Sequence, residues 1–349
     1  MASIPEKYNL ETYNYYLPEE LIAYYPLKER THSKLMVIER NSQKIFFHEK
    51  FSEIENYLYK GDLLILNNTK VFPARLKGKK LTGGDVELLL FQKPFGLKFV
   101  TEALIKGKRI KKDTKIEISE DLKVKILEKM DGGKFLVELE SKKKPLNQII
   151  YKYGKAPLPP YIKREPEDFD LERYQTVYAE KEGSIAAPTA GLHFDKDLLK
   201  KLTSKGIILK YITLHIGYGT FAPIKVKDIR KHKIEPEYVE VENDVIEEIK
   251  KALLEKRRII AVGTTVVRTL EFVKQKGLIP YKGFCDLYIY PGFQFQIVSA
   301  MITNFHLPKS SLLLLVCAFA GKDLIFKAYE EAIKRKYRFY SYGDATFII

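Results

Sequence analysis

The sequence predicts an α/β fold in which a layered α/β domain is interrupted by a small β-barrel domain. Three changes of pattern along the 349 residues support this prediction. Residues 63–66 form a continuous apolar run, which is typical of a parallel strand buried on both faces. Residues 115–126 instead alternate apolar and polar side chains, as strands with one solvated face do. After residue 160, apolar strands alternate with helical segments, as in an α/β layered domain.

The elements of the α/β domain are predicted in two stretches. In the first, short helices are expected at residues 18–23 and near 51–58, and a strand at 34–39 precedes the strand at 63–66. In the second, Asp195 is expected to cap a helix that ends at Leu202, and Asn243 to cap a helix over 244–256. Further helices are predicted at 264–276, 310–320 and 323–334, and strands at 207–215, 258–262 and 284–290.

The middle of the chain predicts the inserted barrel. Turn residues at Gly83-Gly84 and Asp131-Gly132-Gly133 separate short strands with no helix between them, a pattern that favours a small barrel or closed sandwich. The expected strands are residues 85–91, 98–105, 115–119, 122–127 and 134–140. We therefore predict an inserted β-barrel domain over residues 72–157 and a discontinuous α/β catalytic domain over 1–71 and 158–349.

The formal net charge is +15 at pH 7, which favours a polyanionic partner through phosphate neutralisation. A lysine-rich composition is also found in heat-adapted proteins, so charge alone leaves a nucleic-acid partner undecided. Only Cys285 and Cys317 are present, which argues against a disulfide framework or a zinc site and for a reducing cytoplasm. No apolar run follows Met1, and none in the chain approaches the length of a membrane span, so we expect no secretory signal and no membrane partner. We expect a cytoplasmic protein, and we also expect a monomer.

The most informative stretch is residues 184–194, which carries little charge in a chain that is 30% charged. It combines small residues with Pro188, Thr189 and His193, and Gly191 allows backbone to approach a ligand closely. Composition alone favours a tight buried loop before a helix. His193, His215 and His306 are the candidate catalytic groups, each open to a purely structural role. No histidine pair has metal-ligand spacing, so no metal site is expected.

Other polar residues follow predicted strands, where open α/β sheets bind ligands. Gly217 and Gly219 follow one strand, and Gly263 joins another to a helix whose free N–H groups suit an anion such as a carboxylate. Asn67, Asn68 and Thr69 end an apolar strand and either face a cleft or form a turn. Arg75 and Arg268 suit phosphate or carboxylate, or an ordinary ion pair. Tyr161 and Tyr174 suit base stacking, or packing.

Several blocks together carry a family resemblance. They are Leu17–Ala23, Asn67–Arg75, Pro157–Ile162, Tyr174–Tyr178, Ser184–Phe194, His215–Phe221, Gly263–Leu270, Thr303–Ser310 and Tyr340–Ala345. In this order they resemble the S-adenosylmethionine:tRNA ribosyltransferase-isomerases of queuosine biosynthesis, from about Tyr8 to the C-terminus. The resemblance is weakest over residues 92–152.

The resemblance implies an enzyme that transfers and isomerises the ribosyl group of S-adenosylmethionine. The acceptor would be 7-aminomethyl-7-deazaguanine at the wobble position of tRNA, and the product epoxyqueuosine-tRNA, with release of adenine and methionine. S-adenosylmethionine would be a co-substrate, and no tightly bound cofactor is expected. The substrate-binding residues predicted in this way are Asn67, Asn68, Thr69, Arg75, Tyr161, Tyr174, Gln175, Ser184, Ala187, Pro188, Thr189, Gly191, Gly217, Gly219, Thr220, Phe221, Gly263, Thr264, Thr265 and Arg268.

Two other functions remain open from the residues themselves. One is a non-catalytic RNA-binding protein that uses its basic charge and its barrel. The other is a hydrolase in which Ser184 or Ser310 acts with a histidine, although no GxSxG elbow is present. Release of adenine that depends on precursor tRNA separates all three functions.

Overall fold

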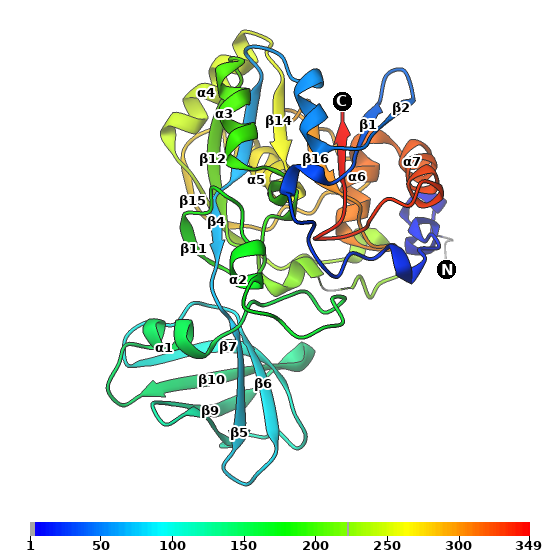
Figure 1. The fold of residues 1–349 in the computed structure, drawn as a ribbon. Helices are drawn as coiled ribbons and strands as arrows, with labels where there is room; N and C mark the ends of the chain where they lie inside the picture. Colours follow the sequence, from blue (N-terminus) through cyan, green and yellow to red (C-terminus); the bar gives the residue numbers. More distant parts are fainter. Residues whose placement is uncertain (1–3, 222) are drawn as a thin grey trace. The chain divides into compact units, whose positions relative to one another are not determined.

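The computed structural model describes residues 4–221 and 223–349, and the chain forms two compact units (Figure 1). Unit 1 comprises the residues up to 68, residues 176–179 and residues 188–349. Unit 2 comprises residues 69–175 and 180–187. Unit 1 is an α/β layered structure and unit 2 contains a closed barrel, so the predicted fold class is confirmed. The domain boundaries at 71/72 and 157/158 stay a prediction.

Unit 1 is built on a mixed sheet with the strand order β15-β13-β12-β3-β14-β16-β17-β1-β2. Its centre is parallel, because β3 pairs in parallel with β12 and β14, and β14 with β16. Every residue of β3 is buried, which explains its continuous apolar sequence. The strands are β1 (Leu35–Glu39), β2 (Lys44–His48), β3 (Leu63–Asn67), β12 (Ile208–Leu214), β13 (Glu237–Val241), β14 (Ile259–Val262), β15 (Tyr281–Cys285), β16 (Ala300–Asn304) and β17 (Ala345–Ile348).

Helices cover the sheet of unit 1. One core cluster joins alternate residues of β1, β3, β14 and β16 to Leu198 and Leu202 of α3, to Phe51 and to Phe194. The alternation follows from the strand period of two, which sends one set of side chains to each face. Helix α5 packs on β12, β3, β14 and β16. The α-helices of unit 1 are α3 (Lys196–Ser204), α4 (Asn243–Leu254), α5 (Thr264–Gln275), α6 (Ser311–Ala320) and α7 (Lys322–Lys334).

Two local predictions for unit 1 are corrected by the structure. Asn243 does not cap α4 but is its first residue, and Glu242 holds the cap position without a side-chain hydrogen bond to the first turn of the helix. The strand expected at residues 284–290 instead runs from Tyr281 to Cys285, because it pairs antiparallel with β13 in that register. Asp195 caps α3 as predicted, and its carboxylate accepts a hydrogen bond from Leu198 N–H at 2.7 Å.

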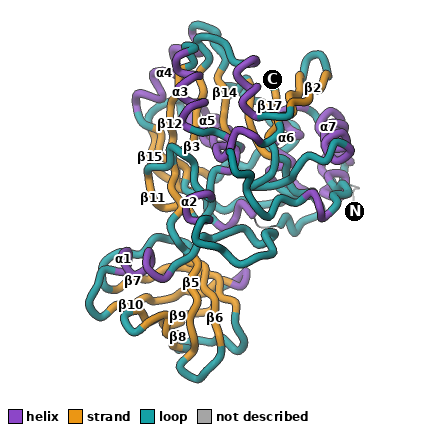
Figure 2. Tube along the Cα trace, viewed as in Figure 1, coloured by secondary structure: helices purple, strands orange, loops and turns teal. Residues whose placement is uncertain are grey.

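Unit 2 contains an antiparallel closed barrel with the strand order β10-β7-β6-β5-β8-β9 (Figure 2). The sequence missed β5, where Leu76 is the only fully buried residue and the apolar signal is correspondingly weak. Residues 85–140 are all described and contain no α-helix, as predicted. The barrel strands are β5 (Arg75–Lys80), β6 (Asp85–Leu90), β7 (Lys98–Lys106), β8 (Lys115–Ser119), β9 (Leu122–Lys129) and β10 (Lys134–Ser141).

Short elements complete both units. In unit 2, β4 (Thr69–Val71) pairs in parallel with β11 (Lys181–Ser184), and the helices are α1 (Leu146–Tyr153) and α2 (Asp170–Arg173). The remaining elements are 3₁₀ turns: η1 (Glu6–Tyr8), η2 (Leu10–Tyr13), η3 (Glu19–Leu21), η4 (Arg30–His32), η5 (Phe51–Tyr57), η6 (Asp131–Gly133), η7 (Thr189–His193), η8 (Tyr218–Phe221) and η9 (Ile229–Lys231).

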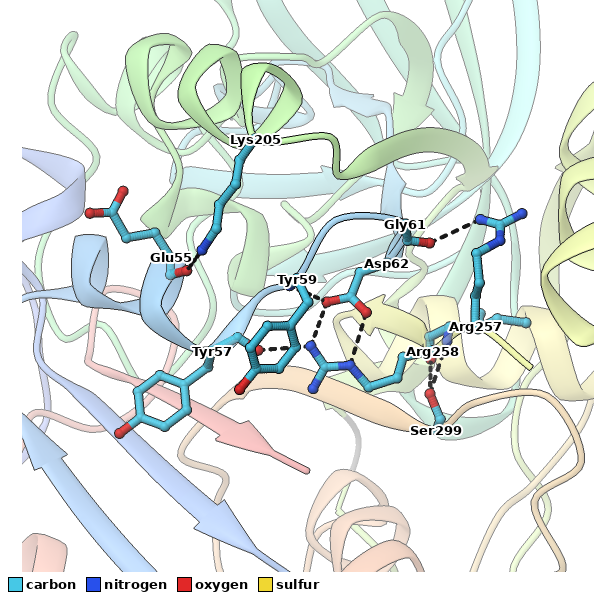
Figure 3. Close-up of polar contacts among 10 residues, drawn as sticks. Glu55, Tyr57, Tyr59, Gly61, Asp62, Lys205, Arg257, Arg258 and Ser299 are labelled. Atoms are coloured by element: carbon cyan, nitrogen blue, oxygen red, sulfur yellow. Dashed lines mark hydrogen bonds and ion pairs between the residues drawn. The ribbon is translucent and has the colours of Figure 1, made fainter. Parts of the chain in front are cut away.

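A cluster of ion pairs and hydrogen bonds lies at the amino ends of β3 and β14 in unit 1 (Figure 3). The buried Asp62 carboxylate accepts from Arg258 Nε at 2.9 Å, and Arg258 also donates to the Tyr57 carbonyl at 2.8 Å. Arg257 donates to the Gly61 carbonyl at 3.0 Å. These contacts with backbone carbonyls and a carboxylate hold the amino ends of β3 and β14 together.

Candidate active site

Four parallel strands of unit 1 have their carboxyl ends on the same side of the sheet. Predicted site residues lie at or just after each of these strand ends. The Gly263 N–H donates to the Ile302 carbonyl at 2.8 Å, which holds the chain after β14 against β16. Carboxyl ends of parallel strands are where open α/β sheets bind ligands. The strand ends are Asn67 of β3, Leu214 of β12 before His215, Val262 of β14 before Gly263, and Asn304 of β16 before Phe305 and His306.

Helix α5 begins at this edge with groups suited to an anion. Gly263 has φ +98, a conformation that glycine adopts without strain, and Thr264 is the first helical residue. The hydroxyl of Thr265 is buried and lacks a hydrogen-bond partner among the described residues. The first N–H groups of a helix have no partner within the helix and lie at its positive dipole end. The Gly263 N–H bonds to the Ile302 carbonyl and the Val266 N–H to the Gly263 carbonyl. The donors that the start of α5 offers to a ligand group are therefore the N–H groups of Thr264 and Thr265 and the Thr265 hydroxyl.

Arg268 lies one turn into α5 and is held by Glu237, a residue that the sequence analysis missed. The two side chains are both almost fully buried, and Arg268 Nη1 donates to Glu237 Oε2 at 2.6 Å. Arg268 Nε donates to the Leu287 carbonyl at 2.9 Å, whereas Nη2 is buried with no partner in the described part of the chain. The other Glu237 oxygen accepts from Gly217 N–H at 3.0 Å. Glu237 thus joins the Gly217 turn to Arg268.

The predicted loop after Pro188 forms η7, next to the start of α5. A Cβ placed on Gly263 would lie 3.7 Å from the Ala190 methyl group. A Cβ on Gly191 would lie 2.0 Å from the Tyr178 hydroxyl oxygen, so this position requires glycine for packing. The hydroxyls of Thr176 and Tyr178 are buried without a partner among the described residues. The loop is tightly packed, yet it leaves polar atoms unsatisfied beside the strand ends.

His193 is buried in a hydrogen-bond chain. Its Nε2 lies 3.1 Å from Asn304 Nδ2, and its Nδ1 lies 2.7 Å from Ser33 Oγ. Its ring packs against Phe51 in a tilted arrangement, with the ring centroids 5.1 Å apart. Because Asn304 Nδ2 can only donate, Nε2 accepts and Nδ1 carries the proton that goes to Ser33. Burial lowers the pKa of His193 to about 3, with the positive charges of Arg338 and Arg30 as smaller causes. The imidazole is neutral at pH 7 and is a weak base.

The other two candidate histidines differ in exposure. Burial lowers the pKa of His306 to about 3, and its Nε2 lies 2.8 Å from Thr303 Oγ1. His215 is only half-buried and stacks on Tyr238, with ring centroids 5.8 Å apart. His215 is therefore the most accessible of the three and lies two residues before Gly217.

Asn67 and Asn68 are bound to the neighbouring strand. Asn67 donates to the Leu214 carbonyl and accepts from the Leu214 N–H, both at 3.0 Å. Asn68 Oδ1 accepts from the Thr213 hydroxyl at 2.7 Å. These side chains extend the β3–β12 ladder beyond the last paired residues, which favours a structural role over a direct substrate contact.

Unit 2 holds most of the remaining predicted substrate-binding residues. Arg75 lies 3.4 Å from Glu87, an ordinary ion pair, and the Gln175 amide makes two hydrogen bonds with the Val71 backbone at 3.0 and 2.7 Å. The Ser184 hydroxyl donates to the Ala186 carbonyl at 2.6 Å. Thr69, Tyr174 and Ala187 are buried, and Tyr161 is half-buried. In unit 1, Gly219 approaches Glu235, whereas the side chains of Thr220 and Phe221 lie outside the described residues.

The residues that the sequence missed are Glu237, Ser33 and Asn304. Asn304 carried the same signal as Asn67, a polar side chain that ends an apolar strand. Glu237 and Ser33 had no such signal, because their partners lie 31 and 160 residues away along the chain. The described residues contain no group of three potential metal ligands, and none of their helices is long and apolar enough to cross a membrane.

Comparison with known proteins decides the family. The family model described as queuosine biosynthesis protein matches residues 10–348. This chain belongs to the queuosine biosynthesis family. It is 52% identical over 342 residues to the S-adenosylmethionine:tRNA ribosyltransferase-isomerase of Aquifex aeolicus, covering 97% of this chain and 99% of that protein. The enzyme of the same name from Sulfurihydrogenibium is 50% identical over 342 residues, with the same coverage.

A solved structure of the queuosine biosynthesis family agrees. The S-adenosylmethionine tRNA ribosyltransferase from Thermotoga maritima is 35% identical, with a TM-score of 0.56. The likeness covers 97% of this chain and 99% of that one. The predicted family resemblance is thereby confirmed over its full length.

Proposed function

We propose that this chain transfers the ribosyl group of S-adenosylmethionine to 7-aminomethyl-7-deazaguanine at the wobble position of tRNA. It rearranges the ribose to an epoxycyclopentane, which gives epoxyqueuosine-tRNA, and it releases adenine and methionine. The chain is an enzyme of the tRNA ribosyltransferase-isomerase class, in keeping with the names of relatives about half identical to it over nearly their whole length.

S-adenosylmethionine binds at the start of α5 in this proposal. The observation that carries it is the pair of buried, unpartnered groups, Thr265 Oγ1 and Arg268 Nη2, on the strand-end edge of unit 1. A buried donor without a partner costs about 1–3 kcal/mol, so such atoms are expected to meet a ligand. The carboxylate of the methionine part suits these donors and the first N–H groups of α5.

The three histidines take different roles in this proposal. A base with a pKa near 3 removes protons poorly at pH 7, so His193 positions Asn304 and the η7 loop. His306 has an equally low pKa and braces Thr303. The half-buried His215, beside the Gly217 turn, is our candidate for removing the sulfonium-activated C5′ proton. Departing adenine is stabilised by hydrogen bonds from the polar groups around η7.

The finer features of the protein belong to the same proposal. We expect a cytoplasmic monomer that binds tRNA without a tightly held cofactor. Cys285 and Cys317 are buried and not disulfide-bonded, as suits a reducing compartment. Light scattering of the purified chain checks the oligomeric state.

Adenine release tests the activity itself. The protein is expected to release adenine from S-adenosylmethionine only when tRNA carrying the precursor base is present. Binding of tRNA without adenine release supports a non-catalytic RNA-binding protein instead. Adenine release without tRNA contradicts the acceptor.

A matched pair of threonine variants tests the location of S-adenosylmethionine. Thr265→Val removes a hydroxyl that has no hydrogen-bond partner among the described residues, so we expect no loss of thermal midpoint. The KM for S-adenosylmethionine should rise about tenfold, because the lost hydrogen bond to the ligand is worth about 1.4 kcal/mol. Thr269→Val removes a hydroxyl that donates to the Thr265 carbonyl at 2.9 Å, so the thermal midpoint should fall while the KM holds. An unchanged KM in Thr265→Val contradicts the location.

A further inference from the structure

The barrel of unit 2 has a hollow that nothing in the proposed active site uses. It has a volume of about 1320 Å³ and is lined by the β5–β6 hairpin, the end of β7 and the β8 strand. Glycine forms part of its wall because the backbones come close: a Cβ on Gly78 would lie 2.6 Å from the Glu117 carbonyl oxygen. A Cβ on Gly107 would lie 3.3 Å from Val86.

Lysines dominate the charge of this hollow. Lys77, Lys79, Lys80, Lys106 and Lys108 line it, against Asp85, Glu87 and Glu117. Glu87 already pairs with Arg75 at 3.4 Å, and Lys77 pairs with Glu165 at 2.7 Å. Lys80 Nζ donates to the Lys108 carbonyl at 3.0 Å, so the two lysine-bearing loops are held side by side.

The loop that leaves β7 strengthens the positive field. Residues 106–112 contain Lys106, Lys108, Arg109, Lys111 and Lys112 and no acidic residue. Lys106 and Lys108 are exposed, and neither forms an ion pair in the described part of the chain. Neighbouring cations that outnumber the carboxylates around them repel one another, and a bound polyanion relieves that repulsion.

The side chains that line the hollow indicate which chemical group it binds. No aromatic side chain lines the hollow, so it offers no surface on which a base could stack. Lysine ammonium groups contact phosphate oxygens without reading sequence. We propose that this basic hollow binds the phosphate backbone of the substrate tRNA, an inference that rests on the proposed function.

The same barrel supplies a control surface. Lys143 and Lys144 are exposed and follow β10, beside the start of β7, where Ser141 N–H bonds to the Leu97 carbonyl. Lys106 ends β7, eight residues from its first residue, Lys98. At about 3.3 Å per residue the two lysine pairs lie at opposite ends of a strand roughly 26 Å long.

The test compares two double variants of equal charge. Lys106→Gln with Lys108→Gln is expected to weaken binding of precursor tRNA about tenfold near physiological salt. It should also flatten the slope of log affinity against log salt by about 1.5, because two phosphate contacts are lost. Lys143→Gln with Lys144→Gln is expected to change both values little. Thermal midpoint and the KM for S-adenosylmethionine should be unchanged in both variants.

Each other outcome overturns the inference. Equal losses of tRNA affinity in the two double variants mean that only the overall charge matters. Unchanged tRNA affinity in the Lys106→Gln, Lys108→Gln variant means that Lys106 and Lys108 are solvated and contact no phosphate. A larger loss in the second variant moves the tRNA contact to the other end of the barrel. The proposed function is tested separately, because its failure appears as absent adenine release by the unaltered protein.

Discussion

At the scale of single residues, the decisive feature is how the buried polar groups are partnered. The Asn304 amide donates to His193 and to the Tyr340 carbonyl at 3.0 Å, which leaves Oδ1 buried without a partner among the described residues. Arg268 Nη2 and Thr265 Oγ1 are likewise buried without a hydrogen-bond partner among the described residues. Buried polar atoms are almost always hydrogen-bonded. These three exceptions lie at the strand ends where we propose that S-adenosylmethionine binds, and others, such as Arg40 Nε and Ser141 Oγ, lie elsewhere in the chain.

His193 predicts an acid-sensitive stability. Its pKa falls from the ordinary value of 6.5 to about 3 on folding, so below pH 6.5 the unfolded chain binds a proton that the folded chain does not. The stability contributed by this neutral histidine is full above pH 6.5 and is lost as pH falls toward 3. The thermal midpoint of His193→Gln should therefore approach that of the unaltered protein between pH 7.5 and 5. A gap that stays constant over this range contradicts the shift.

The ion pair of Arg268 with Glu237 predicts a large effect on stability. Glu237→Ala leaves a buried guanidinium without its counter-ion, so we expect a loss of about 3–5 kcal/mol in the free energy of unfolding, measured by urea denaturation. The exposed pair Lys250–Glu247 on α4 is the control, and Glu247→Ala should cost no more than about 0.5 kcal/mol. Similar losses in both variants contradict the importance of the buried pair.

At the scale of elements, two glycines near the site serve different purposes. A Cβ on Gly191 would overlap the Tyr178 hydroxyl, whereas a Cβ on Gly217 would meet no atom within 4 Å. Gly191 is therefore required by packing within unit 1. Gly217 lies at the turn after β12, where Glu237 holds its N–H and the space above it is open.

The two glycines predict opposite variants. Gly191→Ala should lower the free energy of unfolding by about 1–3 kcal/mol, because the added methyl group overlaps the Tyr178 hydroxyl. Gly217→Ala should leave the thermal midpoint nearly unchanged and raise the KM for S-adenosylmethionine, because its methyl group enters the proposed binding space. Steady-state kinetics and thermal melts separate the two effects, and a Gly217→Ala enzyme with normal KM removes this turn from the site.

At the scale of the whole molecule, the net charge of +15 predicts strongly salt-sensitive tRNA binding. Affinity for precursor tRNA should fall by orders of magnitude between low and physiological salt, measured by filter binding or fluorescence anisotropy. The KM for S-adenosylmethionine should change far less, because that ligand meets buried groups. Affinity for tRNA that stays flat with salt contradicts an electrostatic origin.

The sequence predicted much of the architecture because local patterns report local structure. The all-apolar β3, the alternating barrel strands and the Asp195 cap each depend on neighbours within a few residues. The missed β5 and the shifted β15 show where this fails. Leu76 is nearly alone as an apolar signal in β5, and β15 is placed by its register with β13 rather than by its own sequence.

The sequence by itself determined the fold class and the family, and it indicated the segments of the proposed site. Only the tertiary structure decided how their side chains are used. It showed Asn67 bonded to a neighbouring strand, His193 neutral between Ser33 and Asn304, and Arg268 paired with Glu237. The reason is physical: burial and partners set the charge state of a polar group, and both depend on residues brought together from distant parts of the chain.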